Sequence, residues 1–240
     1  MSDFRCYAPD LDQAKETIEL SQFESHHLIS TNRARKGDSV IVFNGLGLEW
    51  EAMVVDADRR KCLLHRNRVI VRKAPSLEIT LAVAIIKGKT FDIILRQATE
   101  LGTSCIQPLV TERTQVRLDE NRSKSDKWSQ QLIEACKQSG NPWLPRLKQA
   151  VKLEDYLETT DQTCSCVASL EAGTQPWNTL KSSDGKATLF VGPEGDFSPG
   201  EYRLLEDHKI LPVSLGAYVL RSETAVTAGL TRLRAVLERN

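Results

Sequence analysis

The chain has 240 residues, 40% of them hydrophobic and 27% charged, and its formal net charge is zero. This composition predicts a globular protein with one large or two small domains, and it excludes a disordered or collagen-like chain. The zero net charge gives no general argument for nucleic-acid binding, and no apolar run reaches the length of a membrane span.

The first residues lack the basic and then apolar pattern of a secretory signal, so we expect a cytoplasmic protein with no membrane partner. Six cysteines are scattered along the chain, and none has the spacing of a zinc knuckle or a thioredoxin site. They are interpreted as structural thiols, and no metal site is predicted.

The first seventy residues have the pattern of a β module. Short runs rich in Val, Ile and Leu predict strands at Ser39–Phe43, Glu49–Val55 and Cys62–Val71. The segment Asn44–Gly47 supplies residues that tolerate positive φ, as a hairpin between the first two strands requires. Short strands with tight turns predict a small barrel or sandwich.

A basic stretch ends this β module. Seven Lys or Arg residues and no acidic residue lie between Arg59 and Lys73. Such a face binds phosphates even when the whole chain is neutral, but basic residues on a solvated strand edge also prevent aggregation. The residues alone leave both interpretations open. Ala74–Ser76 then reads as a linker, which predicts domains at 1–73 and 74–240.

Beyond Pro75 the pattern changes to strands that alternate with helices, which predicts a mainly parallel sheet covered on both faces. The predicted strands are Leu77–Ile86, Cys105–Val110, Cys164–Leu170, Ala187–Val191 and Ile210–Leu215. The predicted helices are Lys89–Leu101, Ser125–Ser139 and Ser222–Glu238. Gly102 is expected to end the first helix in a left-handed conformation.

A first glycine-rich turn, Phe190–Glu201, directly follows a predicted strand. Its end is a helix start, where Ser198 and Glu201 form the pattern of a capping box around Pro199. Glycines in such a turn let the backbone approach a ligand at the carboxyl end of the sheet. A tight turn without a ligand is equally compatible with these residues.

A second turn, Leu215–Ala225, also follows a strand and opens a helix, which Ser222 or Thr224 is expected to cap. Arg221 places a positive charge near the positive end of that helix, which is locally unfavourable. This conflict suggests a role for Arg221, such as holding a phosphate or pairing with Glu194 or Glu223. An ordinary surface salt bridge is the alternative.

These two turns resemble the paired motifs of the RsmE family, SPOUT-class enzymes that methylate N3 of a uridine in small-subunit ribosomal RNA. The motifs that carry the resemblance are Gly192-Pro193-Glu194-Gly195 and Leu220-Arg221-Ser222-Glu223-Thr224-Ala225. Further similar segments, in the same order, are Gly37-Asp38, Lys87-Gly88-Lys89, Ala98–Gly102, Glu112-Arg113 and Gln138-Ser139-Gly140. The resemblance covers nearly all of the chain.

The resemblance implies an α/β fold: a SPOUT-type trefoil-knot domain with a mainly parallel sheet, preceded by a small PUA-like β-barrel domain. It implies a homodimer, a ribosomal RNA or small-subunit partner, and S-adenosyl-L-methionine as the cofactor. The cofactor-binding residues carried over from the motifs are Val191, Gly192, Pro193, Glu194, Gly195, Leu215, Gly216, Leu220, Ser222, Thr224 and Ala225.

Methylation of N3 of uridine requires a proton acceptor and groups that stabilise charge on the flanking carbonyl oxygens. We assign the electrostatic role to Arg221 and keep Glu223 and Glu194 as proton acceptors. Glu100 is a weaker candidate, because pairing with Arg96 at the helix end explains it. The expected RNA-binding residues are Arg33, Arg66, Arg68, Arg113, Arg117 and Gln138.

The chain departs from the family pattern at several positions. Tyr218 and Asn141 stand where the family usually has Arg, Asp196 replaces a common Gly, and Lys137 replaces a common Glu. Two alternatives therefore stay open. One is a methyltransferase of this fold that acts on another RNA, such as transfer RNA. The other is a non-catalytic RNA-binding module.

Overall fold

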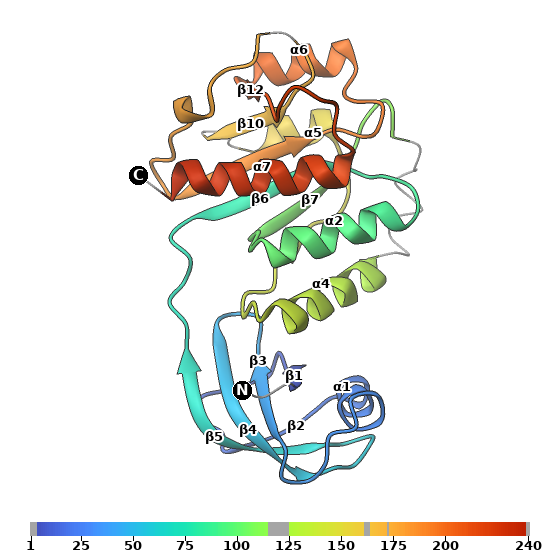
Figure 1. Cartoon of the computed structure of the whole chain (residues 1–240), viewed down its shortest axis with the longest axis vertical. Helices are drawn as coiled ribbons and strands as arrows, with labels where there is room; N and C mark the ends of the chain where they lie inside the picture. The colour runs from blue at the N-terminus through green and yellow to red at the C-terminus, as the bar shows by residue number, and fades with distance from the viewer. Residues whose placement is uncertain (1–3, 115–124, 161–163, 172, 239–240) are drawn as a thin grey trace. The chain divides into compact units, whose positions relative to one another are not determined.

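The structure is a computed structural model, and it describes residues 4–114, 125–160, 164–171 and 173–238 (Figure 1). The chain forms two compact units. One comprises Met1–Ala74 with Ile133–Leu144, and the other comprises Pro75–Leu132 with Pro145–Asn240. Among the described residues, no helix has the length and apolar character needed to cross a membrane.

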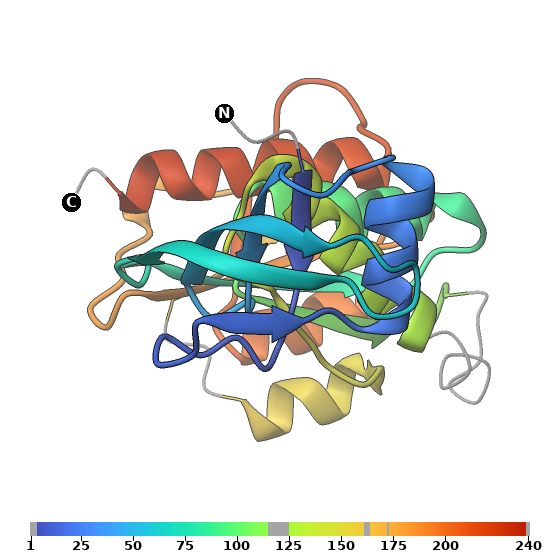
Figure 2. The same cartoon turned by 90° about the horizontal axis from the view of Figure 1, so that it is seen from below.

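The N-terminal unit is built on a five-stranded sheet in the order β1-β3-β4-β5-β2. Its strands are β1 (Phe4–Tyr7), β2 (Thr17–Glu19), β3 (Ser39–Phe43), β4 (Leu48–Asp56) and β5 (Leu63–Val71). The pairing of β1 with β3 is parallel and the other pairings are antiparallel. Figure 2 shows the long strands β4 and β5 curving beside each other, which suits a small module that closes around its own core.

Alternation along the central strands creates the core of this unit. Val40, Val42, Trp50, Ala52 and Val54 are each at most 1% exposed, whereas residues between them face outward. A short helix, α1 (Gln22–His26), continues into a π-helical turn, η1 (His27–Thr31). The sequence pattern predicted the three long strands but not β1, β2 or this helical segment.

A buried ion cluster ties the last turn of α4 (Ser125–Ser139) to this unit. Lys137 Nζ donates to Glu24 Oε1 at 3.2 Å and to Glu134 Oε1 at 3.0 Å, and it lies 2.8 Å from His27 Nδ1. Lys137 is 8% exposed and Glu24 is 4% exposed. Because a buried charge is tolerated only when it is paired, the cluster explains why Ile133–Leu144 packs with the N-terminal unit.

The second unit contains a seven-stranded sheet in the order β12-β10-β11-β6-β7-β8, with β9 paired to β7, and its strand pairings are parallel. Its strands are β6 (Glu78–Ala84), β7 (Cys105–Val110), β8 (Arg146–Leu147), β9 (Val151–Lys152), β10 (Ser165–Ala168), β11 (Lys186–Val191) and β12 (Leu211–Val213). Its helices are α2 (Lys89–Glu100), α5 (Leu153–Thr159), η2 (Trp177–Thr179), α6 (Pro199–Asp207) and α7 (Ser222–Leu237).

Neighbouring residues of β11 show how the helices cover both faces of the sheet. Phe190 packs in a core cluster with residues of α5 and α6. The next residue back, Leu189, points to the opposite face, because side chains alternate along a strand. There the Leu189 side chain packs against Gly229 of α7. The contact is so close that a Cβ added at Gly229 would lie 2.7 Å from the Leu189 side chain. Helix α2 packs beside α7 on this second face (Figure 1).

The path of the chain after β12 positions the site. Strand β12 lies at the edge of the sheet next to β10, whereas the following helix α7 packs on β11. The chain therefore returns from the edge toward the middle of the sheet through residues 214–221. At the end of this return, Ser222 Oγ donates to the carbonyl oxygen of Gly192 at 3.4 Å, so the two glycine turns meet.

The structure confirms the predicted strands and helices of both units to within two residues at each end. It also confirms the capping box of Ser198 and Glu201 and the left-handed Gly102, whose φ is 71°. The predicted cap of α7 is wrong. Arg221 is the N-cap residue and makes no side-chain cap hydrogen bond, and the Ser222 hydroxyl bonds to Gly192 instead.

Candidate functional site

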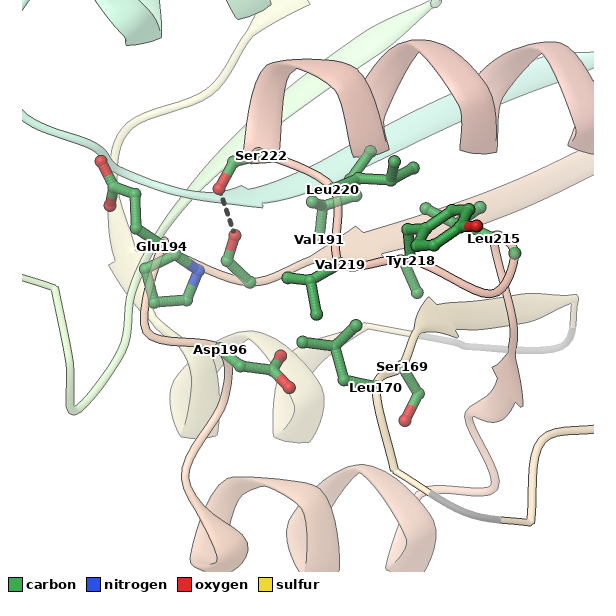
Figure 3. Close-up of a pocket in the computed structure, with 15 residues that line it drawn as sticks. Ser169, Leu170, Val191, Glu194, Asp196, Leu215, Tyr218, Val219, Leu220 and Ser222 are labelled. Carbon is green, nitrogen blue, oxygen red and sulfur yellow. Dashed lines mark hydrogen bonds between the residues drawn. The ribbon is translucent and has the colours of Figure 1, made fainter.

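A cavity lies where three loops follow three adjacent parallel strands, β10, β11 and β12 (Figure 3). The carboxyl ends of parallel strands meet at one edge of a sheet, which is where open α/β folds bind ligands. The cavity has a volume of about 540 Å³, including its open mouth. Its lining residues are Ala168, Ser169, Leu170, Val191, Gly192, Pro193, Glu194, Asp196, Leu215, Gly216, Tyr218, Val219, Leu220, Ser222 and Ala225.

The first glycine loop, Gly192–Phe197, is packed closely on itself. A Cβ at Gly192 would lie 3.2 Å from both Asp196 Oδ1 and the Phe197 ring, so the turn favours a glycine there. Asp196 has a φ of 62°, in the left-handed region that Asp tolerates better than most residues. Its carboxylate accepts from the Phe197 N–H at 2.9 Å and from the Tyr202 hydroxyl at 2.8 Å.

Two side chains brace this loop from outside. Glu201 is 9% exposed, and its two carboxylate oxygens each accept a backbone N–H at 2.8 Å, one from Ser198 and one from Glu112. The Arg113 guanidinium donates to the carbonyl oxygen of Gly195 and, at 3.4 Å, to that of Phe197. The first loop is therefore held by the capping box of α6 and by the segment after β7.

The second loop, Ser214–Arg221, presents apolar side chains to solvent. Tyr218 is 84% exposed and Val219 is 76% exposed, and both line the cavity. Leu170, which lines it from the loop after β10, is 58% exposed. Figure 3 shows Val219 and Leu170 facing each other across the cavity. This arrangement offers an apolar slot for a flat ring.

The charged residues of the cavity are both acidic. Among the described residues that line it, Glu194 and Asp196 carry carboxylates, and no Lys, Arg or His is present. Glu194 is exposed, whereas Asp196 is half-buried. The cavity therefore combines apolar walls, backbone groups and negative charge, which suits a ligand that has an aromatic ring and a positive charge.

The structure gathers most of the sequence-predicted cofactor residues around this cavity. Nine line it: Val191, Gly192, Pro193, Glu194, Leu215, Gly216, Leu220, Ser222 and Ala225. Gly195 and Thr224 do not. Sequence reasoning did not assign the loop Ala168–Leu170, Asp196, Tyr218 or Val219 to the site. The loop Ala168–Leu170 could have been assigned to the site, because it lies at the carboxyl end of a predicted parallel strand.

The predicted catalytic residues differ in position. Glu194 lines the cavity, whereas Arg221 and Glu223 do not. Arg221 is exposed at the start of α7, between the lining residues Leu220 and Ser222. Within the described part of the chain, no ion pair joins Arg221 to Glu194 or Glu223. Glu100 pairs with Arg96 at 3.6 Å, as the sequence suggested.

The basic residues predicted to contact RNA have varied surroundings. Arg33 is exposed and has a φ of 61°. Arg66 lies over the Trp50 ring at 5.5 Å, and Arg68 pairs with Glu51 at 3.5 Å. Arg113 donates to the first glycine loop, and Gln138 is exposed near the end of α4. Arg117 lies outside the described residues.

Part of the basic stretch between Arg59 and Lys73 is neutralised within the N-terminal unit. Besides Arg68, Lys61 pairs with Glu19 at 3.2 Å and Arg72 pairs with Glu49 at 2.6 Å. The buried Glu49 also accepts from Arg5 at 2.7 Å. The positive charge available to phosphates is therefore smaller than the sequence count suggests.

The parallel α/β sheet with its cavity at the strand ends provides a ligand site, and similarity to known families identifies the class as RNA methyltransferases. Two family models match accordingly. The model described as an RNA methyltransferase domain matches residues 72–234, and the model described as an RNA methyltransferase PUA domain matches residues 24–65.

Curated relatives identify the family. The ribosomal RNA small subunit methyltransferase E of Synechocystis is 33% identical over 228 residues, which are 92% of this chain and 74% of that protein. The enzyme of the same name from Rickettsia conorii is 29% identical and covers 90% of this chain and 89% of that protein. The chain belongs to the ribosomal RNA small subunit methyltransferase E family.

Solved structures agree with this assignment. A methyltransferase from Legionella pneumophila, in complex with its bound cofactor S-adenosylmethionine, is 33% identical with a TM-score of 0.90, and the match covers 97% of each chain. The ribosomal RNA small subunit methyltransferase E of Neisseria gonorrhoeae is 24% identical with a TM-score of 0.87 over 97% of each chain. The predicted fold class, a SPOUT-type domain preceded by a PUA-like module, is confirmed.

Proposed function

We propose that the protein uses S-adenosyl-L-methionine to methylate N3 of a uridine in the 16S ribosomal RNA of the small subunit. The observation that carries the proposal is the cavity between the loops that follow β10, β11 and β12. The two RsmE-like motifs contribute to its walls, and the Legionella relative of the same fold binds S-adenosylmethionine.

The residues of the cavity fit this cofactor. Val219 and Leu170 provide apolar faces against which an adenine ring can pack, and the apolar side chains of Val191 and Leu220 also line the cavity. Backbone groups of the glycine loops are available to hydrogen-bond the adenine edge and the methionine carboxylate. The carboxylates of Glu194 and Asp196 suit the positive charge of the cofactor. When bound, its sulfonium supplies an activated methyl group, so alignment provides much of the rate.

The chain's own residues then act on the uridine. Arg221 is exposed beside the cavity, and we assign it the stabilisation of negative charge on the carbonyl oxygens that flank N3. Glu194, at the wall of the cavity, and Glu223, in the first turn of α7, are the proposed acceptors of the N3 proton. Replacement of Arg221 by Ala should lower methyl transfer about a hundredfold or more without unfolding the protein.

We assign RNA binding to the PUA-like domain, residues 1–73, with further RNA contacts from residues 74–240, and methyl transfer to residues 74–240. The segment Ile133–Leu144 belongs to the second stretch in sequence but packs with the N-terminal unit. The exposed Arg33 and Gln138, with Arg66, Arg68, Arg113 and Arg117, are the proposed RNA contacts. Partners are ribosomal RNA and the small ribosomal subunit, and the proposed location is the cytoplasm.

We also propose a homodimer. The exposed Leu170, Tyr218 and Val219 form an apolar surface at the mouth of the cavity, and a second copy of the chain would cover it. Light scattering of the purified protein at several concentrations tests this assembly. The expected mass is twice that of the 26.9 kDa chain, and a mass of one chain at all concentrations would overturn it.

The decisive test of the function is nucleoside mass spectrometry of 16S ribosomal RNA from a strain that lacks the protein. We expect N3-methyluridine to disappear, to return with the wild-type gene, and not to return with Arg221→Ala. Calorimetry with S-adenosylmethionine is run in parallel. Binding with unchanged 16S RNA would favour another RNA substrate, and absence of binding would favour a non-catalytic module.

A further inference from the structure

Asp196 is a charged side chain that the structure turns toward the cavity. Figure 3 shows its carboxylate directed at the space between Val219 and Leu170, while Glu194 lies at the outer end of the first loop. Asp196 is half-buried and Glu194 is exposed, so a charge on Asp196 is less screened by water. The sequence pattern had identified Asp196 only as a replacement for a common Gly.

The orientation of Asp196 is fixed by its neighbours. The Tyr202 hydroxyl lies 2.9 Å from Oδ1 and 2.8 Å from Oδ2, and the Phe197 N–H donates to Oδ1 at 2.9 Å. The Tyr202 ring in turn packs edge-on against Phe197, with ring centroids 5.8 Å apart. Burial raises the pKa of Tyr202, and the Asp196 carboxylate adds to the shift, so the hydroxyl remains a donor.

The positive φ of Asp196 is a second indication that its side chain has a role. A left-handed conformation costs a residue with a Cβ more free energy than it costs glycine. The chain nevertheless holds Asp196 at a φ of 62°, and the carboxylate accepts from two donors, the Phe197 N–H and the Tyr202 hydroxyl. A glycine would satisfy the backbone there at lower cost, so the carboxylate itself calls for an explanation.

The reaction changes the charge of the cofactor, and this offers that explanation. S-adenosylmethionine has a net positive charge, because its sulfonium adds to a balanced ammonium and carboxylate. After methyl transfer, S-adenosylhomocysteine has a neutral thioether and no net charge. A cavity with two carboxylates and no basic residue among its described lining residues interacts more favourably with the charged form.

We propose that the Asp196 carboxylate, oriented by Tyr202, is a specificity-determining group that favours binding of S-adenosylmethionine over S-adenosylhomocysteine. The inference rests on the proposed function, because it assumes that this cavity is the cofactor site. It assigns Asp196 a role that glycine at this position would not have. It also gives a physical reason for release of the product, because the attraction to the sulfonium is lost when the methyl group leaves.

The test compares the dissociation constants of both compounds, measured by calorimetry, for the wild type and for Asp196→Asn. Asn retains the shape, tolerates a left-handed φ and keeps an acceptor for the Phe197 N–H. The ratio of the S-adenosylhomocysteine constant to the S-adenosylmethionine constant should fall about tenfold, equal to about 1.4 kcal/mol. Asp207→Asn, an exposed change on α6 outside the cavity, is the matched control and should leave the ratio unchanged.

Different outcomes separate this inference from the proposed function. If the ratio in Asp196→Asn equals that of the wild type, because both affinities are unchanged or both fall by the same factor, the inference is overturned. The assignment of the cavity as the cofactor site would then still stand. Failure of the wild type to bind either compound would instead overturn the proposed function. If Asp196→Asn does not fold, Asp196→Gly keeps the backbone conformation and is expected to show the same fall in the ratio.

Discussion

The two glycine loops that line the cavity are built in different ways. The first, Gly192–Phe197, is fixed by the capping box of α6, by Glu201 and by Arg113. The second, Ser214–Arg221, is anchored at its first residue, where the Trp177 Nε1–H donates to the Ser214 carbonyl oxygen at 2.8 Å, and beyond it Tyr218 and Val219 are exposed.

This difference indicates which wall is organised before a ligand binds. Several hydrogen bonds, of which the two of the capping box are buried, hold the first loop in one geometry without help from a ligand. The second loop exposes apolar area that water solvates poorly, so a ligand or a second copy of the chain would stabilise it. Substitutions in the first loop should therefore reduce stability and binding together, whereas those in the second should reduce binding with little loss of stability.

The largest effect is expected for Glu201→Ala. The change removes the acceptors of two backbone N–H groups, those of Ser198 and Glu112, and breaks the capping box. The free energy of unfolding should fall by about 2–4 kcal/mol, measured by urea denaturation. Glu201→Gln is the control: it keeps one acceptor oxygen and should lose roughly half as much. A loss below about 0.5 kcal/mol for the Ala variant would contradict a preorganised first loop.

The next largest loss of stability is expected for Gly192→Ala, and Gly216→Ala in the second loop is the comparison. The new Cβ at position 192 would meet Asp196 Oδ1 and the Phe197 ring at 3.2 Å, which should cost about 1–2 kcal/mol and push Asp196 into the cavity. At Gly216 nothing lies within 4 Å, so the φ of 141° gives only local strain. Calorimetry should show the larger loss of S-adenosylmethionine affinity for Gly192→Ala, and the reverse order would refute the comparison.

A smaller effect is expected when the hydroxyl of Tyr202 is removed. Tyr202→Phe loses the hydrogen bonds to Asp196 and should cost about 1 kcal/mol at pH 8. Burial, and then the Asp196 carboxylate, raise the pKa of Tyr202 above its ordinary value of about 10. The unfolded chain therefore loses this proton first as the pH rises, so the stabilisation is complete below about pH 10 and declines above it.

Urea denaturation at several pH values from 8 to 11 measures this dependence. The stability difference between the wild type and Tyr202→Phe should shrink as the pH passes 10. A difference that stays constant, or grows, with pH would show that the tyrosine hydroxyl does not brace the loop in its protonated form.

The smallest effect on stability is expected for Tyr218→Ala in the second loop. Tyr218 is 84% exposed, so its truncation should change the free energy of unfolding of a single chain by less than about 0.5 kcal/mol. Denaturation at the lowest workable protein concentration measures this. A loss above 1 kcal/mol under these conditions would mean that the second loop is as firmly held as the first.

Much of the fold followed from local sequence patterns. Period-two and helical apolar patterns gave the strands β3–β7 and the helices α2, α4 and α7, since burial on one face imposes those periods. The capping box around Ser198 was also readable, because its two partners lie within one helical turn. The short strands β1 and β2 escaped prediction, because three or four residues are too few to show a period.

Only part of the candidate site could be predicted from the sequence. The two glycine turns identified most of its walls, but the loop Ala168–Leu170 joined them only because β10 lies between β11 and β12 in the sheet. The Ser222 hydroxyl was expected to cap its own helix and instead bonds to Gly192, thirty residues earlier. Lys137 likewise bonds to Glu24, which lies more than a hundred residues earlier in the chain.

The sequence by itself therefore determined the class of fold, the order of its elements and the two turns that resemble the family motifs. Each of these depends on spacing between near neighbours, which local conformation and burial control directly. Only the tertiary structure decided that Asp196 faces the cavity, that Arg113 braces the first loop and that Tyr218 stands in solvent. These features depend on the order of the strands and on the return of the chain after β12, which bring distant residues together.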